Sequence, residues 1–221
     1  MGSNGWQPFI DWNNLLFLGT GLGWTLALAG ISIILSSFFG IIFALMRTSG
    51  IKWLNYPAYI CVHALRNTPL LLIIFFTYFA LPKFNLILPA FWAGVVALTI
   101  FTSALVAEIF RGGIQSIPRG QWEAARAQGF NWVQTMTYII FPQAFKKVIP
   151  PLVSQFTSTI KDTSYCFIIS VPELFSKGQV FFTRYNNPIQ TLAVSAILYF
   201  IICYALTSYS RRLEEKLSYG N

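Results

Sequence analysis

The chain has 221 residues, of which 55% are hydrophobic and only 10% are charged, and its formal net charge is +8. Soluble domains carry about 25% charged residues, so this chain cannot hide its apolar side chains in one water-soluble core. In a soluble protein the basic excess would suggest nucleic acid, but in a membrane protein it is typical of cytoplasmic loops. The composition therefore predicts an integral protein embedded in membrane lipid, with no nucleic-acid partner.

Few residues here suit catalysis or metal binding. His63 is the only histidine, and the cysteines Cys61, Cys166 and Cys203 lie far apart without a metal-binding spacing. The chain also lacks the glycine-rich pattern of a P-loop, so it carries no nucleotide site of that kind. We therefore expect no catalytic residue, no metal site and no cofactor bound by this chain, which by itself is not an enzyme.

A spanning helix needs about 20 mostly apolar residues, and five segments qualify. They are residues 22–46, 56–81, 89–110, 148–171 and 189–210. Residues 1–20 are rich in aromatic side chains, which suits the membrane interface and leaves open whether they form a short surface helix. With no internal repeat or linker in view, the sequence predicts an all-α, polytopic membrane protein with five spans and a single domain over residues 1–221.

Basic residues gather in the loops on one side of these spans. That side has Arg47, Lys52, Arg111, Arg119, Arg126, Lys146, Lys147, Arg211, Arg212 and Lys216, whereas the other side has Lys83, Lys177 and Arg184. Because cytoplasmic loops carry an excess of Lys and Arg, we expect the N-terminus outside and the C-terminus in the cytoplasm.

The cytoplasmic loop expected at about residues 116–147 contains small residues at fixed intervals beside an acidic one. The pattern consists of Glu123, Ala124, Ala125, Gly129, Ile139 and Pro142. Small residues let the surface of another protein approach the backbone closely. An ordinary amphipathic loop with a solvated Glu123 would explain the first three residues alone, but the spaced glycine and proline favour a docking surface.

Local signals predict the shape of this loop. Residues 121–128 contain strong helix formers, and Gly129 is placed to end that helix in a left-handed conformation. Asn131 can cap a second helix that runs to about residue 141, where Pro142 limits its continuation. The sequence therefore predicts two short helices joined at a glycine bend.

The loop resembles the EAA loop of ABC-type importer permeases, which reads E-A-A, three residues, G, nine residues, I, one residue, L-P. Phe141 stands where that family usually has Leu. Residues 64–71, 107–125 and 161–174 are similar to further motifs of the polar amino acid branch, with Asn67 in place of a Gly. The motifs occur in the same order, and the resemblance covers about residues 20–217.

This resemblance implies a MetI-like fold and a dimer of permeases, whose second chain is identical or homologous. It also implies ABC ATPase subunits that bind ATP and magnesium, an external solute-binding protein, and a place in the bacterial cytoplasmic (inner) membrane. On this interpretation the ATPase acts on the loop at Glu123, Ala124, Ala125, Gly129, Ile139 and Pro142.

Two ionisable residues fall near the middle of the fourth predicted span. Lys161 and Asp162 lie about 20 Å along that helix, where charged groups are costly and usually line a pathway or pair internally. Ser154, Ser158 and Lys161 share one helix face. We hypothesise that Lys161 holds a substrate carboxylate and Asp162 its ammonium group; alternatively, both neutralise other helices, for example Lys161 with Glu108.

The second predicted span is interrupted at Arg66, Asn67, Thr68 and Pro69. Broken helices at membrane depth can form substrate sites, and the resemblance makes Arg66 a candidate gate or carboxylate contact. The alternative is a structural role near backbone carbonyls. Glu108 and Arg111 are spaced to pair on one helix face. The candidate pathway residues are Arg66, Thr68, Ser154, Ser158, Lys161, Asp162 and Thr163.

Together these patterns predict the permease subunit of an ATP-driven amino acid importer that works by alternating access. Arg66 and Lys161 favour glutamate, aspartate or glutamine, although a lone α-carboxylate would explain both residues equally well. One alternative is a secondary transporter driven by an ion gradient, which usually has inverted repeats and more helices. The other is a membrane scaffold that transports nothing.

Overall fold

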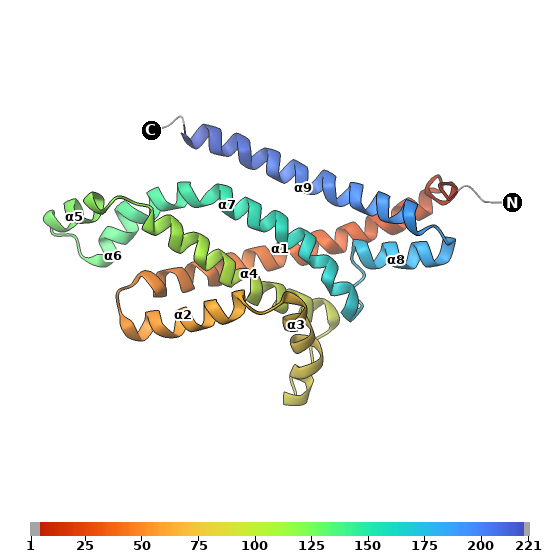
Figure 1. Ribbon diagram of the computed structural model, residues 1–221, viewed down its shortest axis with the longest axis horizontal. Helices are drawn as coiled ribbons and strands as arrows, with labels where there is room; N and C mark the ends of the chain where they lie inside the picture. Colours follow the sequence, from red (N-terminus) through yellow and green to blue (C-terminus); the bar gives the residue numbers. More distant parts are fainter. Residues whose placement is uncertain (1–4, 219–221) are drawn as a thin grey trace. The chain divides into compact units, whose positions relative to one another are not determined.

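The computed structural model describes residues 5–218, with side chains described to residue 212, and its regular secondary structure in this part is all helical (Figure 1). The α-helices are α1 (Trp12–Thr48), α2 (Lys52–Arg66), α3 (Leu70–Phe75), α4 (Ala90–Gln115), α5 (Arg119–Ala127), α6 (Trp132–Gln134), α7 (Phe141–Asp162), α8 (Leu174–Tyr185) and α9 (Pro188–Ser218). Since no strand occurs among the described residues, the predicted all-α fold class is confirmed.

Three helices are long and apolar enough to cross a membrane: α1, α4, and α9 over Pro188–Arg212. A fourth candidate is the bent pair Lys52–Arg66 and Leu70–Phe84. The expected span 148–171 is divided between α7, which contains Pro150 and Pro151, and a 3-10 turn over Thr163–Ile169. Five spans and the orientation of the termini therefore stay predictions.

Helix α1 starts ten residues before the span expected from hydropathy. The Asp11 side chain accepts a hydrogen bond from the backbone N–H of Asn13 at 2.9 Å, which caps the helix. The aromatic N-terminal stretch is thus divided between a 3-10 turn, Gln7–Phe9, and the first turns of α1. A local capping signal extends the helix beyond its apolar core.

The predicted interruption of the second span is a break between α2 and α3. Asn67, Thr68 and Pro69 lie between the two helices. Asn67 donates from its side chain to the carbonyl of His63 at 2.9 Å, so the end of α2 keeps a hydrogen-bond partner where the helix stops.

The described helices fall into two compact units, and four unit boundaries lie inside α1, α4, α7 and α9. Unit 1 consists of Met1–Ile34, Thr68–Thr99 and Phe156–Leu206. Unit 2 consists of Leu35–Asn67, Ile100–Gln155 and Thr207–Asn221. Each of the two units has a buried interior of its own.

The interior of unit 1 is organised around a carboxylate. Glu173 is fully buried, and it accepts hydrogen bonds from the backbone N–H groups of Phe175 and Ser176 at the start of α8. Tyr199 of α9 donates its hydroxyl to the same carboxylate at 2.9 Å, and the Leu174 N–H bonds the Thr25 hydroxyl of α1. The start of α8 is therefore held by both α1 and α9.

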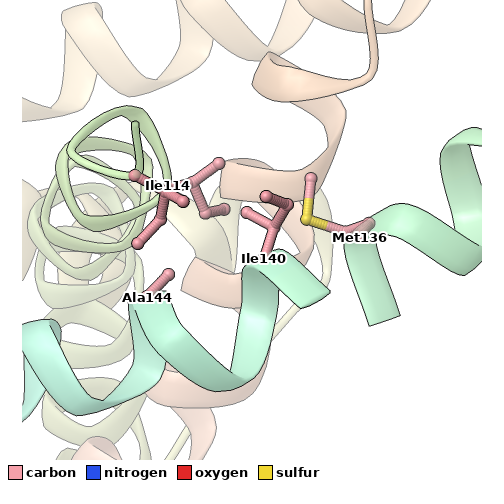
Figure 2. Close-up of a cluster of buried hydrophobic side chains, with 5 residues drawn as sticks. Ile114, Met136, Ile140 and Ala144 are labelled. Carbon is pink, nitrogen blue, oxygen red and sulfur yellow. The ribbon is translucent and has the colours of Figure 1, made fainter. Parts of the chain in front are cut away.

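The interior of unit 2 contains an apolar cluster beneath the loop that joins α4 to α7. Figure 2 shows Ile114 of α4 meeting Ile140 and Ala144, with Met136 beside them. Ile117 completes the buried cluster, and each member is at most 4% exposed. The base of the loop is thus part of a packed core.

The close approach of α4 to α7 depends on Gly113. A Cβ atom at Gly113 would overlap Cγ1 of Val148, whose branched side chain has few alternative rotamers in a helix. We expect Gly113→Ala to lower the free energy of unfolding by about 1–3 kcal/mol, measured by thermal unfolding in detergent. Gly112→Ala is the matched control, because no side chain of the described residues lies within 4 Å of a Cβ added there. An equal loss in both variants would contradict this packing.

Candidate functional site

The loop between α4 and α7 begins with α5, a helix of nine residues (Figure 1). Pro118 lies directly before the first turn of α5, where the backbone N–H that proline lacks would have no acceptor within the helix. On this helix Glu123 and Ala124 are exposed, whereas Ala125 is only 1% exposed. Ala125 therefore faces inward, on a helix that contacts the turn that follows α6, and its contact with a partner stays a prediction.

Gly129 ends α5 in the predicted left-handed conformation, with φ at 82°. Its N–H bonds the carbonyl of Arg126 at 2.9 Å, and the N–H of Phe130 bonds the carbonyl of Ala125 at 3.1 Å. A side chain at this position would be strained, so glycine sets the bend between α5 and α6. Gly129 is exposed and leaves the backbone of the bend accessible.

The second helix of the loop starts as predicted and continues further than predicted. Asn131 and Gln134 form a reciprocal capping box, with both hydrogen bonds at 2.9 Å. A π-helical turn, Thr135–Ile140, then leads directly into α7. The expectation that Pro142 limits this helix is wrong: Pro142 lies in the first turn of α7, where a missing N–H is tolerated, directly after the wider π turn.

Several apolar side chains on this loop lie on its surface. Val133 is 63% exposed and Tyr138 is 71% exposed, next to the half-buried Ile139, which packs against the cluster of Figure 2. Exposed apolar groups on the same loop as Glu123 and Ala124 are typical of a surface that another protein covers. Sequence reasoning missed Val133 and Tyr138, although an aromatic residue in a polar loop was a visible signal.

Among the candidate pathway residues, Lys161 lines a cavity of unit 1. The cavity measures about 580 Å³ and is lined by Lys161, Ser164, Phe175, Leu192, Ser195, Ala196, Tyr199, Phe200 and Cys203. The Lys161 ammonium group shares this space with Ser164 and apolar walls, whereas Oγ of Ser195 is buried and the Tyr199 hydroxyl donates to Glu173. Sequence reasoning missed Ser195 and Tyr199, because α9 reaches this cavity only through the folded packing of unit 1.

The other candidates on this part of the chain do not line that cavity. Asp162 is half-buried at the end of α7, about 100° around the helix from Lys161. Thr163 is fully buried, and its hydroxyl donates to the carbonyl of Ile160 at 2.7 Å. Ser154 is exposed and Ser158 is half-buried on α7. The structure therefore does not bring Lys161 and Asp162 together at the cavity.

Arg66 ends α2 and forms an ion pair, and Thr68 lies half-buried two residues later. Nη1 of Arg66 lies 3.2 Å from Oε2 of Glu108. The predicted pair of Glu108 and Arg111 is also present, with Nη2 to Oε2 at 2.8 Å, and Arg47 pairs with Oε1. The sequence left open that Glu108 neutralises Lys161, but in the structure three arginines of unit 2 contact both its oxygens.

Over the described residues, no group of three or more His, Cys, Asp or Glu side chains is arranged to hold a metal ion.

The sequence of this chain is similar to those of known membrane transport proteins. A family profile described as binding-protein-dependent transport system inner membrane component matches residues 36–218. The chain is 45% identical over 206 residues to the probable glutamine ABC transporter permease protein GlnP of Bacillus subtilis (strain 168), covering 91% of this chain and 94% of that relative.

Solved structures of ABC transporters also match this chain. A crystal structure of an amino acid ABC transporter with histidines matches with a TM-score of 0.86 and 32% identity, over 91% of this chain and 94% of that one. The inward-facing MetNI methionine ABC transporter matches with a TM-score of 0.81 over 94% and 99% of the two chains, and at 16% identity this likeness shows the fold alone.

The chain therefore belongs to the family of binding-protein-dependent transport system inner membrane components. It has the MetI-like fold and is a permease subunit of the ABC type, a membrane component whose ATPase is a separate chain. This membership favours the ATP-driven importer over the ion-gradient-driven transporter and the scaffold.

Because Ala125 is buried, it is the small residue of the loop at which a larger side chain should be most destabilising. We expect Ala125→Leu to open α5 from the turn after α6, at a cost of about 1–3 kcal/mol, and to raise the rate of trypsin cleavage after Arg126 by about fivefold or more. Ala124→Leu, with its side chain in solvent, is the control and should leave the rate near that of the wild type. Equal rates for the two variants would refute the inward orientation of Ala125.

Proposed function

We propose that this permease passes a polar amino acid from an external solute-binding protein to the cytoplasm, with glutamine, glutamate and aspartate as the favoured substrates. The energy comes from ATP and magnesium bound by ABC ATPase subunits on separate chains. A second permease chain, identical or homologous, completes the pathway in a bacterial cytoplasmic membrane. Alternating access to the two sides moves the substrate.

The observation that carries this proposal is the surface of the loop at residues 116–147. The loop presents Glu123, Ala124 and Gly129 in solvent and also has exposed apolar side chains, and its base is packed into the core of unit 2. Because α4 and α7 share that core, a movement that a partner imposes on the loop would be transmitted to both helices. We propose that the ATPase binds there.

The substrate assignment is supported by the cavity at Lys161. An α-carboxylate needs a cationic donor, and Lys161 offers one in a cavity that Ser164 also lines. The relative at 45% identity is a probable glutamine permease protein, which favours a polar but uncharged side chain on the substrate. Asp162, Thr163, Ser154, Ser158, Arg66 and Thr68 stay proposed pathway residues without a place in this cavity.

Coupling through the loop is tested by reversing the charge of Glu123. In the complex reconstituted with its ATPase and binding protein, we expect Glu123→Lys to reduce amino-acid-stimulated ATP hydrolysis by about tenfold or more, as loss of a central interface contact does. Glu123→Gln separates loss of the charge from its reversal. Thr183→Lys adds a positive charge at an exposed position on α8 and should hydrolyse ATP as the wild type does. Unchanged stimulation in Glu123→Lys, with normal subunit assembly, would rule out coupling at this residue.

The carboxylate role of Lys161 predicts a loss of affinity. Removing a charged hydrogen-bond donor costs about 1.5–3 kcal/mol, so Lys161→Gln should raise the amino acid concentration for half-maximal uptake into proteoliposomes by about tenfold or more. Lys83→Gln, at an exposed site outside the cavity, serves as the control. The same half-maximal concentration for Lys161→Gln and the wild type would exclude Lys161 from substrate binding.

A further inference from the structure

The first half of α2, in unit 2, forms a cavity along one face of the helix. The cavity measures about 510 Å³, and all its lining residues belong to α2: Lys52, Trp53, Asn55, Tyr56 and Tyr59. Four of them follow the spacing i, i+3, i+4 and i+7, which places their side chains along one side of a helix. The opposite side of α2 packs inward through the buried Ala58 and Val62. The cavity is therefore on the outer face of α2.

The aromatic side chains of this cavity are exposed to an unusual degree. Trp53 is 89% exposed, Tyr56 is 68% exposed and Tyr59 is 46% exposed. Trp and Tyr are enriched where a membrane meets water, because an apolar ring and a polar N–H or O–H group suit the two sides of that boundary. Ile51 and Ile60 nearby are also more than half exposed. This face thus has the composition of a contact with the interfacial layer of a bilayer.

A contact with α1 gives the depth of the cavity. Helix α1 is long and apolar enough to cross a membrane, and its apolar run ends at Met46, directly before Arg47. The guanidinium carbon of Arg47 lies 5.4 Å from the centroid of the Tyr59 ring, so Tyr59 lies near the edge of the hydrocarbon. Lys52 lies about 10 Å further out along α2, at a rise of about 1.5 Å per residue. The cavity therefore extends from the hydrocarbon edge into the headgroup layer.

The charge of the cavity is complementary to an anionic headgroup. No described acidic side chain pairs with Lys52, and the sequence has no acidic residue between Asp11 and Glu108. Three arginines already engage Glu108. The Asn55 amide and the Tyr56 hydroxyl provide further hydrogen-bond donors on the same face. An ammonium group beside neutral donors suits a phosphate, and lysines near a membrane surface strengthen the binding of anionic lipids.

We propose that this face of α2 is a binding site for an anionic phospholipid. Lys52 binds the phosphate, and Asn55 and Tyr56 donate to oxygens of the headgroup or the glycerol. The rings of Trp53 and Tyr59 contact the upper part of an acyl chain. A phosphatidylcholine headgroup has a cation of its own, which offsets the attraction to Lys52, so the site favours a lipid with net negative charge. The site requires neither the proposed substrate nor an ATPase at the loop.

The test is lipid binding to the complex of the permease and its ATPase, measured by native mass spectrometry in detergent. Phosphatidylglycerol and phosphatidylcholine with the same acyl chains are titrated separately. We expect phosphatidylglycerol to bind with an apparent Kd about fivefold or more below that of phosphatidylcholine, since one Lys at a membrane surface contributes about this factor. Equal affinities for the two lipids would overturn the proposal.

Substitutions of lysine show whether the preference arises at this cavity. Lys52→Gln should reduce the preference to about twofold or less, whereas Lys52→Arg keeps the charge and should retain it. Lys146→Gln removes another exposed lysine of unit 2, on α7, and should bind both lipids as the wild type does. An equal loss of preference in Lys52→Gln and Lys146→Gln would assign it to the general positive charge of unit 2 and contradict a site at α2.

A substitution of Trp53 separates a lipid from a second permease chain as the occupant of this face. Trp53→Ala should weaken both lipids by about threefold or more and keep the preference, because it removes contact with the acyl chain and leaves the charge. The same mass spectra report the subunits of the complex. Loss of the second permease chain from the Trp53→Ala complex would show that a protein covers this face, and the lipid site would then be refuted.

Discussion

The requirement that backbone hydrogen bonds be satisfied within the chain governs this fold. In hydrocarbon no water is available to unpaired N–H and C=O groups, so spanning segments are helical and every interruption needs a partner from the protein. Asn67 supplies one at the end of α2, Thr77 donates to the carbonyl of Ile74 in the π-helical region, and Thr163 donates to that of Ile160. Glu173 serves two N–H groups at the start of α8. Small polar side chains thus make the irregular segments tolerable.

The regions with functional chemistry lie at these interruptions. Arg66 precedes the bend between α2 and α3, Lys161 lies one residue before the end of α7, and Gly129 marks the bend of the loop. A regular helix presents its side chains to neighbouring helices and covers its own backbone. Where it stops, side chains can converge on a ligand or expose backbone to a partner, which explains why one constraint organises both the fold and the candidate sites.

Electrostatics illustrates what sequence reasoning can and cannot find at such a site. The pair of Glu108 and Arg111 is predictable because three residues along a helix always place side chains on one face. Arg47 and Arg66 come from the ends of α1 and α2, and their approach to Glu108 depends on how those helices pack in unit 2. Likewise, Lys161 was a predicted candidate, whereas Ser195 and Tyr199 line the same cavity only because of the position of α9.

The sequence by itself determined the features that depend on neighbouring residues: the helical class, the break after Arg66, the glycine bend at Gly129 and the cap at Asn131. These follow from hydropathy, backbone sterics and capping, which act within a few residues. Tertiary structure decided that Ala125 faces inward while Ala124 faces solvent, and that the helix after Asn131 passes through a π turn into α7. Both outcomes depend on contacts with segments distant in sequence, which local propensity does not encode.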